Sequence, residues 1–235
     1  MMKNTIKKLA LVGLIALPTT AIAGVSSTIN ATSDYTFNGV SQTDNGPALQ
    51  ASLDYAADSG WYVGSWASNV DFGSGDDTWL ELDFYAGKYF QLNDSASLDA
   101  GIAYYTYHGD DASSEYQYPE AYAKFGYGSS IGQSELNFWY TWDYFGQDVG
   151  HYIMMAAHTF TLTEGHDIRV SIDRSTSKDD AKWAWDGDES YNHYRAEYMT
   201  AFKGFDFNLA VEGTSMDTDT SDTRAIVSVS RTFDF

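Results

Sequence analysis

The chain has 235 residues and a strong acidic excess, with 33 Asp and Glu against 13 Lys and Arg. This charge argues against nucleic acid and against an anionic lipid surface as partners, because like charges repel. There is no cysteine, which excludes a disulfide framework and a thiolate metal site. Aromatic residues make up 16% of the chain although the mean hydropathy is only -0.36, so apolar side chains are spread over alternate positions.

The first 23 residues form a segment of their own. Lys3, Lys7 and Lys8 precede a short apolar run at 9–17, and Ala21-Ile22-Ala23 follows. This is the pattern of a secretory signal peptide with its cleavage site, and the run is shorter than the about 20 residues of a membrane-spanning helix. We expect residues 1–23 to be cleaved and residues 24–235 to form the exported domain.

Beyond this segment, apolar and polar residues alternate between short stretches rich in Gly, Asn and Asp, which is typical of antiparallel strands. The alternation predicts twelve strands, at 25–39, 47–58, 61–72, 78–92, 95–109, 116–128, 134–146, 151–163, 166–176, 191–203, 205–216 and 223–235. No later apolar run is as long as a transmembrane helix, so a membrane form has to be a closed barrel. The predicted fold is an all-β, closed antiparallel transmembrane β-barrel with both termini periplasmic.

The connections between these strands sort into two kinds. The even-numbered ones are short turns, at 58–60, 92–94, 128–133, 164–165 and 203–204, and the odd-numbered ones include longer acidic stretches, at 73–77, 109–115, 175–190 and 217–222. Aromatic residues gather near both kinds of connection, as in the two interfacial belts of outer-membrane barrels. The loop-side belt is predicted from Tyr107, Tyr116, Tyr118, Tyr144, Phe145, Tyr152, Tyr191 and Tyr194, and the turn-side belt from Tyr89, Phe90, Tyr127, Phe202, Phe205, Phe233 and Phe235.

The polar face of the strands carries many more acids than bases. The predicted lumen-facing acids are Asp34, Asp54, Glu81, Asp83, Asp99, Glu120, Glu135, Asp143, Asp173, Glu197, Asp206 and Glu212, and the bases are Lys124, Arg169, Arg195 and Lys203. A water-filled lumen with this lining would favour cations. The alternative is a lumen filled by its own salt-bridged side chains, since twelve strands lie between a filled eight-stranded barrel and an open one of 16–18. Strands 61–72 and 151–163 alternate too weakly to assign their faces.

Other chemistry has weaker support. Three histidines, His108, His151 and His193, lie near acidic residues at loop-side strand ends, where an Asp/His pair could activate water. No G-x-S-x-G or H-E-x-x-H motif accompanies them, so we predict no enzyme. The acidic stretches 186–189 and 217–222 lack the full spacing of a calcium loop, and solvated loops are the simpler interpretation, so neither a metal nor a cofactor is predicted.

Two further features of the sequence are its last residues and its longest loop. The chain ends in Phe233-Asp234-Phe235, which resembles the C-terminal signal that the barrel-assembly machinery of bacterial outer membranes recognises. The loop 175–190 carries Trp183 and Trp185, and it can fold either into the pore or outward toward lipopolysaccharide.

A family resemblance is concentrated in residues 33–90. It rests on Ser33-Asp34-Tyr35, Phe37, Gly39-Val40-Ser41-Gln42 and Gly46-Pro47-Ala48-Leu49-Gln50, and it continues through "GWYVGSWASNVDF" and "ELDFYAGKYF". These stretches resemble the bacterial Gcw_chp family, also called TorF-family porins. The resemblance implies an outer-membrane barrel.

Two functions therefore remain from the sequence. One is an outer-membrane porin, narrow and cation-leaning, for passive passage of small solutes. The other is a non-conducting structural or adhesive barrel that acts through its acidic external loops. The expected partners are outer-membrane lipids and lipopolysaccharide, the barrel-assembly machinery and small solutes, with no nucleic acid.

Overall fold

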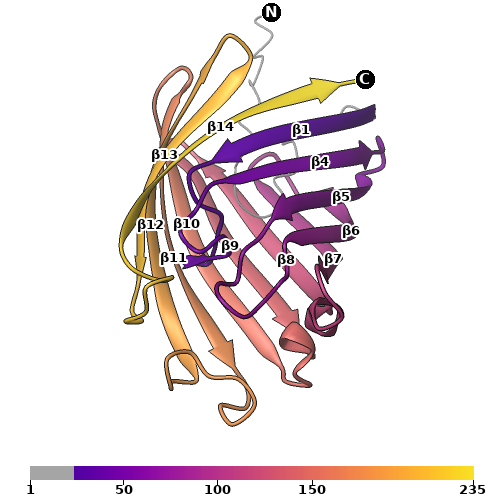
Figure 1. Ribbon diagram of the computed structural model, residues 1–235. Helices are drawn as coiled ribbons and strands as arrows, with labels where there is room; N and C mark the ends of the chain where they lie inside the picture. Colours follow the sequence, from indigo (N-terminus) through magenta and orange to yellow (C-terminus); the bar gives the residue numbers. More distant parts are fainter. Residues whose placement is uncertain (1–23) are drawn as a thin grey trace, which may run out of the picture.

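The computed structural model describes residues 24–235, so the expected signal peptide at 1–23 lies outside the described residues. Twelve strands, each antiparallel to its neighbours, close into a barrel (Figure 1). In chain order they are β1 (Gly24–Thr32), β4 (Ala48–Ala56), β5 (Trp61–Asn69), β6 (Leu80–Gln91), β7 (Ala96–His108), β8 (Tyr118–Ser129), β9 (Gly132–Thr141), β10 (His151–Thr163), β11 (His166–Ser177), β12 (Ser190–Phe202), β13 (Phe205–Thr214) and β14 (Arg224–Asp234). β14 pairs with β1, with Ser26 opposite Asp234, which closes the sheet. The predicted fold class is confirmed.

Four short elements lie in the connections. β2 (Thr36–Phe37) and β3 (Val40–Ser41) form a small hairpin between β1 and β4, and η1 (Ser113–Tyr116) and η2 (Tyr144–Gly146) are single helical turns. Within residues 24–235 no helix combines the length and the apolar character needed to cross a membrane.

The outer face of the barrel is apolar. Side chains at alternate positions of the strands are exposed, including Val25, Ile29, Leu49, Leu53, Val63, Phe84, Ile102, Leu136, Met154, Val170, Ile172, Leu209, Val211 and Val227. Polar residues between them are buried on the opposite face. An apolar exterior on a closed sheet suits a hydrocarbon solvent, because the hydrogen-bond ladders pair the backbone polar groups of neighbouring strands and leave no open edge.

The connections separate as the sequence predicts. The longer ones, at 33–47, 70–79, 109–117, 142–150, 178–189 and 215–223, gather at one end of the barrel, and the short ones, at 57–60, 92–95, 130–131, 164–165 and 203–204, lie at the other (Figure 1). Gly24 pairs with Ala56 beside the first short turn, and the Phe235 amide donates to the Val25 carbonyl at 2.9 Å. Both ends of the described chain therefore lie at the short-turn end.

Two predicted strands run far beyond the observed ones, and the first error is at 25–39. β1 ends at Thr32, and the chain then turns at Asn38 and Gly39, whose φ angles are 48° and 82°. Two consecutive residues with positive φ form the tight turn of a two-residue hairpin, for which Asn-Gly is a favoured pair. Residues 34–46, here called the inward hairpin, therefore fold as a separate unit.

The second error is at 134–146. β9 ends at Thr141, and Phe145 and Gly146 have φ angles of 48° and 67°. A strand cannot continue through residues in the left-handed region. Asp143 and Tyr144, predicted to lie on a strand, therefore belong to an external loop.

The structure also assigns the faces of the two strands that alternate weakly. In β5, Tyr62 and Ser68 are buried and Trp61 and Val63 are exposed, so even-numbered residues face the lumen. In β10 the odd-numbered residues do so: His151, Ile153 and Ala157 are buried.

Candidate functional site

The lumen contains most of the charged residues predicted to line it. Thirteen of them lie on barrel strands, on the face opposite the exposed apolar residues: Asp54, Glu81, Asp83, Asp99, Glu120, Lys124, Glu135, Arg169, Asp173, Arg195, Glu197, Asp206 and Glu212. Three lie elsewhere: Asp34 is in the inward hairpin, Asp143 is in the loop after β9, and Lys203 is exposed in the turn between β12 and β13. Their role in permeation stays a prediction.

One wall of the lumen, formed by β9 to β13, carries a ladder of alternating charges. The guanidinium of Arg169 contacts Glu135 at 3.2 Å and Glu197 at 3.0 Å. Arg195 continues the ladder, bonding Glu197 at 3.2 Å and also Glu212. Glu197 and Glu212 are buried, and buried carboxylates of this kind need such partners because leaving water is costly for a charge.

The ladder reaches the inward hairpin through a histidine. His193 Nδ1 lies 2.7 Å from Asp173, and its Nε2 lies 3.4 Å from Glu212. The other Asp173 oxygen accepts a hydrogen bond of 2.9 Å from Asn38 Nδ2. At Gly39 a Cβ would lie only 2.6 Å from the His193 ring, so the tip of the hairpin packs directly on this wall and requires glycine there.

A second contact fixes the base of the inward hairpin. Asp34 accepts hydrogen bonds from Ser41 at 2.7 Å and from Arg224 at 2.6 Å, and Arg224 also donates to Asn45 at 2.8 Å. The hairpin is thus closed on itself and joined to β14.

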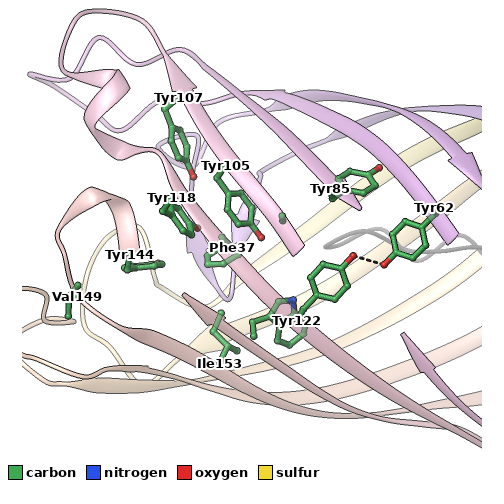
Figure 2. Close-up of a cluster of buried hydrophobic side chains, with 12 residues drawn as sticks. Phe37, Tyr62, Tyr85, Tyr105, Tyr107, Tyr118, Tyr122, Tyr144, Val149 and Ile153 are labelled. Atoms are coloured by element: carbon green, nitrogen blue, oxygen red, sulfur yellow. Dashed lines mark hydrogen bonds between the residues drawn. The ribbon is translucent and has the colours of Figure 1, made fainter. Parts of the chain in front are cut away.

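The rest of the hairpin faces the opposite wall. Phe37 belongs to a buried cluster, mostly aromatic, that includes Tyr85, Tyr105 and Tyr118 of that wall (Figure 2). Tyr35 packs edge-on against Trp66, with ring centroids 5.3 Å apart, and its hydroxyl lies near Glu81. The inward hairpin therefore spans the lumen from β11 and β12 to β5 and β6.

That opposite wall, formed by β4 to β8, pairs carboxylates with tyrosines instead of arginines. The pairs are Tyr62 with Asp99 at 2.6 Å, Tyr105 with Glu120 at 2.8 Å, Tyr107 with Glu81 at 3.2 Å, and Tyr85 with Asp54. The Tyr62 hydroxyl also meets that of Tyr122, as the dashed line in Figure 2 shows. Lys124 is the basic residue among the predicted lining of this wall.

Comparison with known proteins agrees with this architecture. The sequence matches over residues 18–234 the family model described as a bacterial protein of unknown function, Gcw_chp. The chain belongs to the Gcw_chp family. No curated protein matches the sequence.

Several solved structures have a similar barrel fold. The KdgM porin has a TM-score of 0.61 at 10% identity over 88% of this chain and 99% of that chain. A second KdgM porin structure, in complex with disordered oligogalacturonate, has a TM-score of 0.60 at 9% identity, over 89% of this chain and 99% of that chain. An outer membrane channel from Pseudomonas putida F1 has a TM-score of 0.56 at 9% identity, over 92% and 97% of the two chains. The Gcw_chp chain shares its fold with these outer-membrane proteins.

The long-loop end of the Gcw_chp barrel is covered by aromatic side chains. Trp183 of the loop 175–190 packs on Tyr144 and Phe145, with ring centroids 5.0 and 5.5 Å away, and Trp185 packs on Tyr191 at 4.8 Å. The tryptophans of this loop therefore cover the mouth of the barrel instead of pointing away from it. Salt bridges and hydrogen bonds join the loops: Lys182 contacts Asp148 at 2.8 Å, and Tyr116 donates to Asp76 at 2.7 Å, which raises the pKa of Tyr116 to about 12.

The predicted loop-side belt is wrong for six of its members: Tyr116 and Phe145 pack against the buried aromatic cluster, and four tyrosines are buried inside the barrel. Tyr107, Tyr118, Tyr144 and Tyr191 are at most 2% exposed and lie inside the barrel. Six members of the predicted turn-side belt are exposed near the short-turn end, namely Phe90, Tyr127, Phe202, Phe205, Phe233 and Phe235. Tyr89 was predicted with them but lies on the inward face of β6, opposite Asp99. Arg231 lies among these aromatics with its guanidinium 5.1 Å from the Phe205 and Phe233 rings, which accommodates a cation on the outer face.

The histidines do not form the predicted Asp/His pairs at the rim. His193 lies inside the barrel and pairs with Asp173 and Glu212. His151 is buried against the Tyr144 ring at 4.1 Å, and neither of its ring nitrogens has a hydrogen-bond partner among the described residues. His108 contacts the Thr106 hydroxyl at 3.0 Å.

Sequence reasoning missed two charged groups of the lumen, Asp167 and Arg224, and it placed His151 and His193 at the rim instead of inside the barrel. Each lies at an even spacing from a recognised inward residue on the same strand or from its buried neighbours. The period-two rule was therefore sufficient to find them once the strand was placed.

Proposed function

We propose that this chain is an outer-membrane porin that passes small solutes and prefers cations. The observation that carries the proposal is the unequal charge of the two walls. The acids of β9 to β13 are largely neutralised by arginine and histidine, whereas β4 to β8 carry Asp54, Glu81, Asp83, Asp99 and Glu120 with Lys124. An excess of carboxylates in a confined lumen produces a negative potential that attracts cations and repels anions.

The comparison with the KdgM porin bears on the charge of the solute. One structure of that porin is a complex with oligogalacturonate, which is a chain of acidic sugars. A lumen wall rich in carboxylates would repel such a polyanion. The same barrel fold in this chain therefore suits neutral or cationic solutes.

The expected result is that K⁺ permeates better than Cl⁻, most clearly at low salt, because at 1 M salt the Debye length falls to about 3 Å. The measurement is the reversal potential of the refolded protein across a KCl gradient in a planar bilayer. Replacing Glu81 and Asp83 by Gln and Asn should reduce the preference. The matched control replaces Asp217 and Asp219, which are exposed in an outer loop, and should leave it unchanged. An anion-selective pore would contradict the proposal.

A non-conducting barrel is the second candidate, and a specific observation favours it. The inward hairpin spans the lumen, and Trp183 and Trp185 cover its outer mouth. In this case the external loops, together with lipopolysaccharide, would form the functional surface. The absence of any single-channel current from folded protein would support this candidate over the porin.

The proposed location is the outer membrane, with the 1–23 segment cleaved and the short-turn end in the periplasm. The exposed aromatic residues at that end suit a membrane interface. Phe235 is 81% exposed at the end of β14, which leaves it accessible to the barrel-assembly machinery.

Deleting Phe235 is therefore expected to lower the amount of protein inserted into the outer membrane. The barrel itself should tolerate the change, because the residue contributes one backbone hydrogen bond, to Val25. Fractionation of cells, with gel mobility before and after boiling, measures both insertion and folding. The control, deletion of Ser74 in an outer loop, should insert normally. Equal insertion of the Phe235 deletion and the wild type would contradict the prediction.

A further inference from the structure

Four carboxylates follow one another along the inner face of β6 to β8. Asp99 lies opposite Lys124 in the register of β7 and β8, and Glu120 lies opposite Ala103, farther toward the long loops. Asp83 and Glu81 on β6 lie opposite Tyr105 and Tyr107, farther still in the same direction. These four residues, here called the carboxylate track, run along the lumen from near the short-turn end to the inward hairpin.

Three residues of the track have an oxygen that lacks a partner. Glu81 Oε2, Asp83 Oδ1 and Glu120 Oε2 are buried and have no hydrogen-bond partner among the described residues. The side chains themselves are only 2%, 6% and 1% exposed. A buried carboxylate oxygen without a donor is costly, so the track is suited to a ligand that brings positive charge and hydrogen-bond donors.

The chain already holds one ammonium group beside the track. Lys124 Nζ lies 4.8 Å from the centroid of the Tyr122 ring and 5.7 Å from that of Trp139. Aromatic faces attract cations through their negative quadrupole. This wall thus combines carboxylates with aromatic faces, and the position of Lys124 shows that the combination accommodates an ammonium group.

Aromatic rings continue along the rest of the track. Tyr105 and Tyr118 stack with centroids 4.6 Å apart, and Tyr107 packs against Phe145. The Tyr105 hydroxyl donates to Glu120 Oε1 at 2.8 Å, and the Tyr107 hydroxyl donates to Glu81 Oε1 at 3.2 Å. The second oxygen of each carboxylate therefore remains for a ligand.

The spacing of these acids does not suit a compact metal ion. Among residues 24–235 no three Asp, Glu, His or Cys side chains converge in a way that would hold one. Ammonium-bearing molecules are larger, carry an apolar part and bind aromatic faces as well as carboxylates. The opposite wall lacks this character because Arg169 and Arg195 neutralise its acids.

We infer that the carboxylate track binds small organic cations with an ammonium group, primary or quaternary, as they pass through the lumen. The inference rests on the proposed porin function and names its solute class. The track ends at Glu81, next to Tyr35 of the inward hairpin, so access to it from the long-loop end requires the hairpin to move.

The first test uses the wild-type protein in planar bilayers. With KCl on one side and choline chloride on the other, the reversal potential should give a choline to K⁺ permeability ratio above the ratio of their mobilities in water. Choline added to symmetrical KCl should also reduce the K⁺ current, because a bound solute occupies the track. The neutral isostere of choline, with a tert-butyl group in place of trimethylammonium, should leave the current unchanged.

The second test uses Asp83→Asn and Glu120→Gln, each of which keeps the size of the side chain. Each should raise several-fold the choline concentration that halves the K⁺ current, whereas the outer-loop control Asp217→Asn should not. Heat-dependent gel mobility verifies folding, and the isostere comparison on wild type stands even if a variant fails to fold. A cation-selective current that choline and its isostere affect equally overturns the inference and leaves the porin standing. No current at all overturns the proposed porin and the inference with it.

Discussion

Replacing residues 34–46 by a short Gly-Ser turn between β1 and β4 is expected to raise the single-channel conductance several-fold. The inward hairpin crosses the lumen, with Asn38 on Asp173 at one wall and Phe37 in the aromatic cluster at the other. Without it, the interior has the width that twelve strands allow, between a barrel filled by its side chains and an open channel. Currents through both proteins at the same KCl concentration measure the effect.

The control for this replacement is removal of Gly73-Ser74-Gly75 from another connection at the same end of the barrel. These residues lie in an outer loop, and a Cβ at Gly73 or Gly75 would meet nothing within 4 Å. Their removal should leave the conductance unchanged. If the protein without the hairpin conducts no better than the wild type, the hairpin does not obstruct the path.

A single substitution offers a second version of this test. Gly39→Ala would place a methyl group 2.6 Å from both the His193 ring and Thr214 Cγ2, at a φ of 82°. The tip of the hairpin then has to leave the wall, so openings should become more frequent. Gly165→Ala is the matched control, because Gly165 has a similar φ of 79° but a Cβ there would have no atom within 4 Å. It carries the same backbone cost of about 1–2 kcal/mol without a clash.

The strands were predictable because each is a local pattern. Alternation in β6 and β13 places apolar residues such as Phe84 and Leu209 outside and Glu81 and Asn208 inside, as observed. The inward hairpin had a local signal too, since Asn38-Gly39 is a favoured two-residue turn. The residues on either side of it continue to alternate like a strand, and this longer pattern masks the turn.

The tyrosines of the lumen show a second kind of error. Tyr107 has the same parity as the inward Asp99 on β7, and Tyr118 the same parity as Glu120 on β8, so both face inward. Their positions near the loop end of the strands predict a belt. Whether a side chain faces the lumen or the outside, however, depends on whether its position along the strand is odd or even. The face of the strand therefore has to be assigned before the position of a residue along the barrel axis is interpreted.

The partners within the lumen lie beyond sequence reasoning of this kind. Arg169 reaches Glu197 on the adjacent β12, but it also reaches Glu135 on β9, two strands away. The same holds for Asn38, which reaches Asp173 across 135 positions of the chain. Such contacts depend on barrel closure and on the stagger between strands, and no local pattern encodes them.

Arg169→Met is expected to destabilise the barrel by about 3–5 kcal/mol, because it removes the cation that lies between two carboxylates of a buried ion network, and Arg195, which also pairs with Glu212, is then left to balance Glu197. Arg169 itself has a side chain only 7% exposed, between Glu135 and Glu197. Unfolding in guanidinium, followed by tryptophan fluorescence in lipid vesicles, measures the change in the free energy of unfolding.

A triple variant separates the net contribution of these ion pairs to stability from the cost of leaving a buried charge unbalanced. Adding Glu135→Gln and Glu197→Gln to Arg169→Met also removes the two carboxylate charges that faced Arg169, and most of the lost stability should return, because replacing all members of a buried ion cluster is often nearly neutral. Arg174→Met on the same strand is the matched control, since Arg174 is exposed and bonds only the neutral Asn192 and Ser190; its effect should stay within about 0.5 kcal/mol. Equal destabilisation by Arg169→Met and Arg174→Met would show that the ladder does not hold the wall of β9 to β13 together.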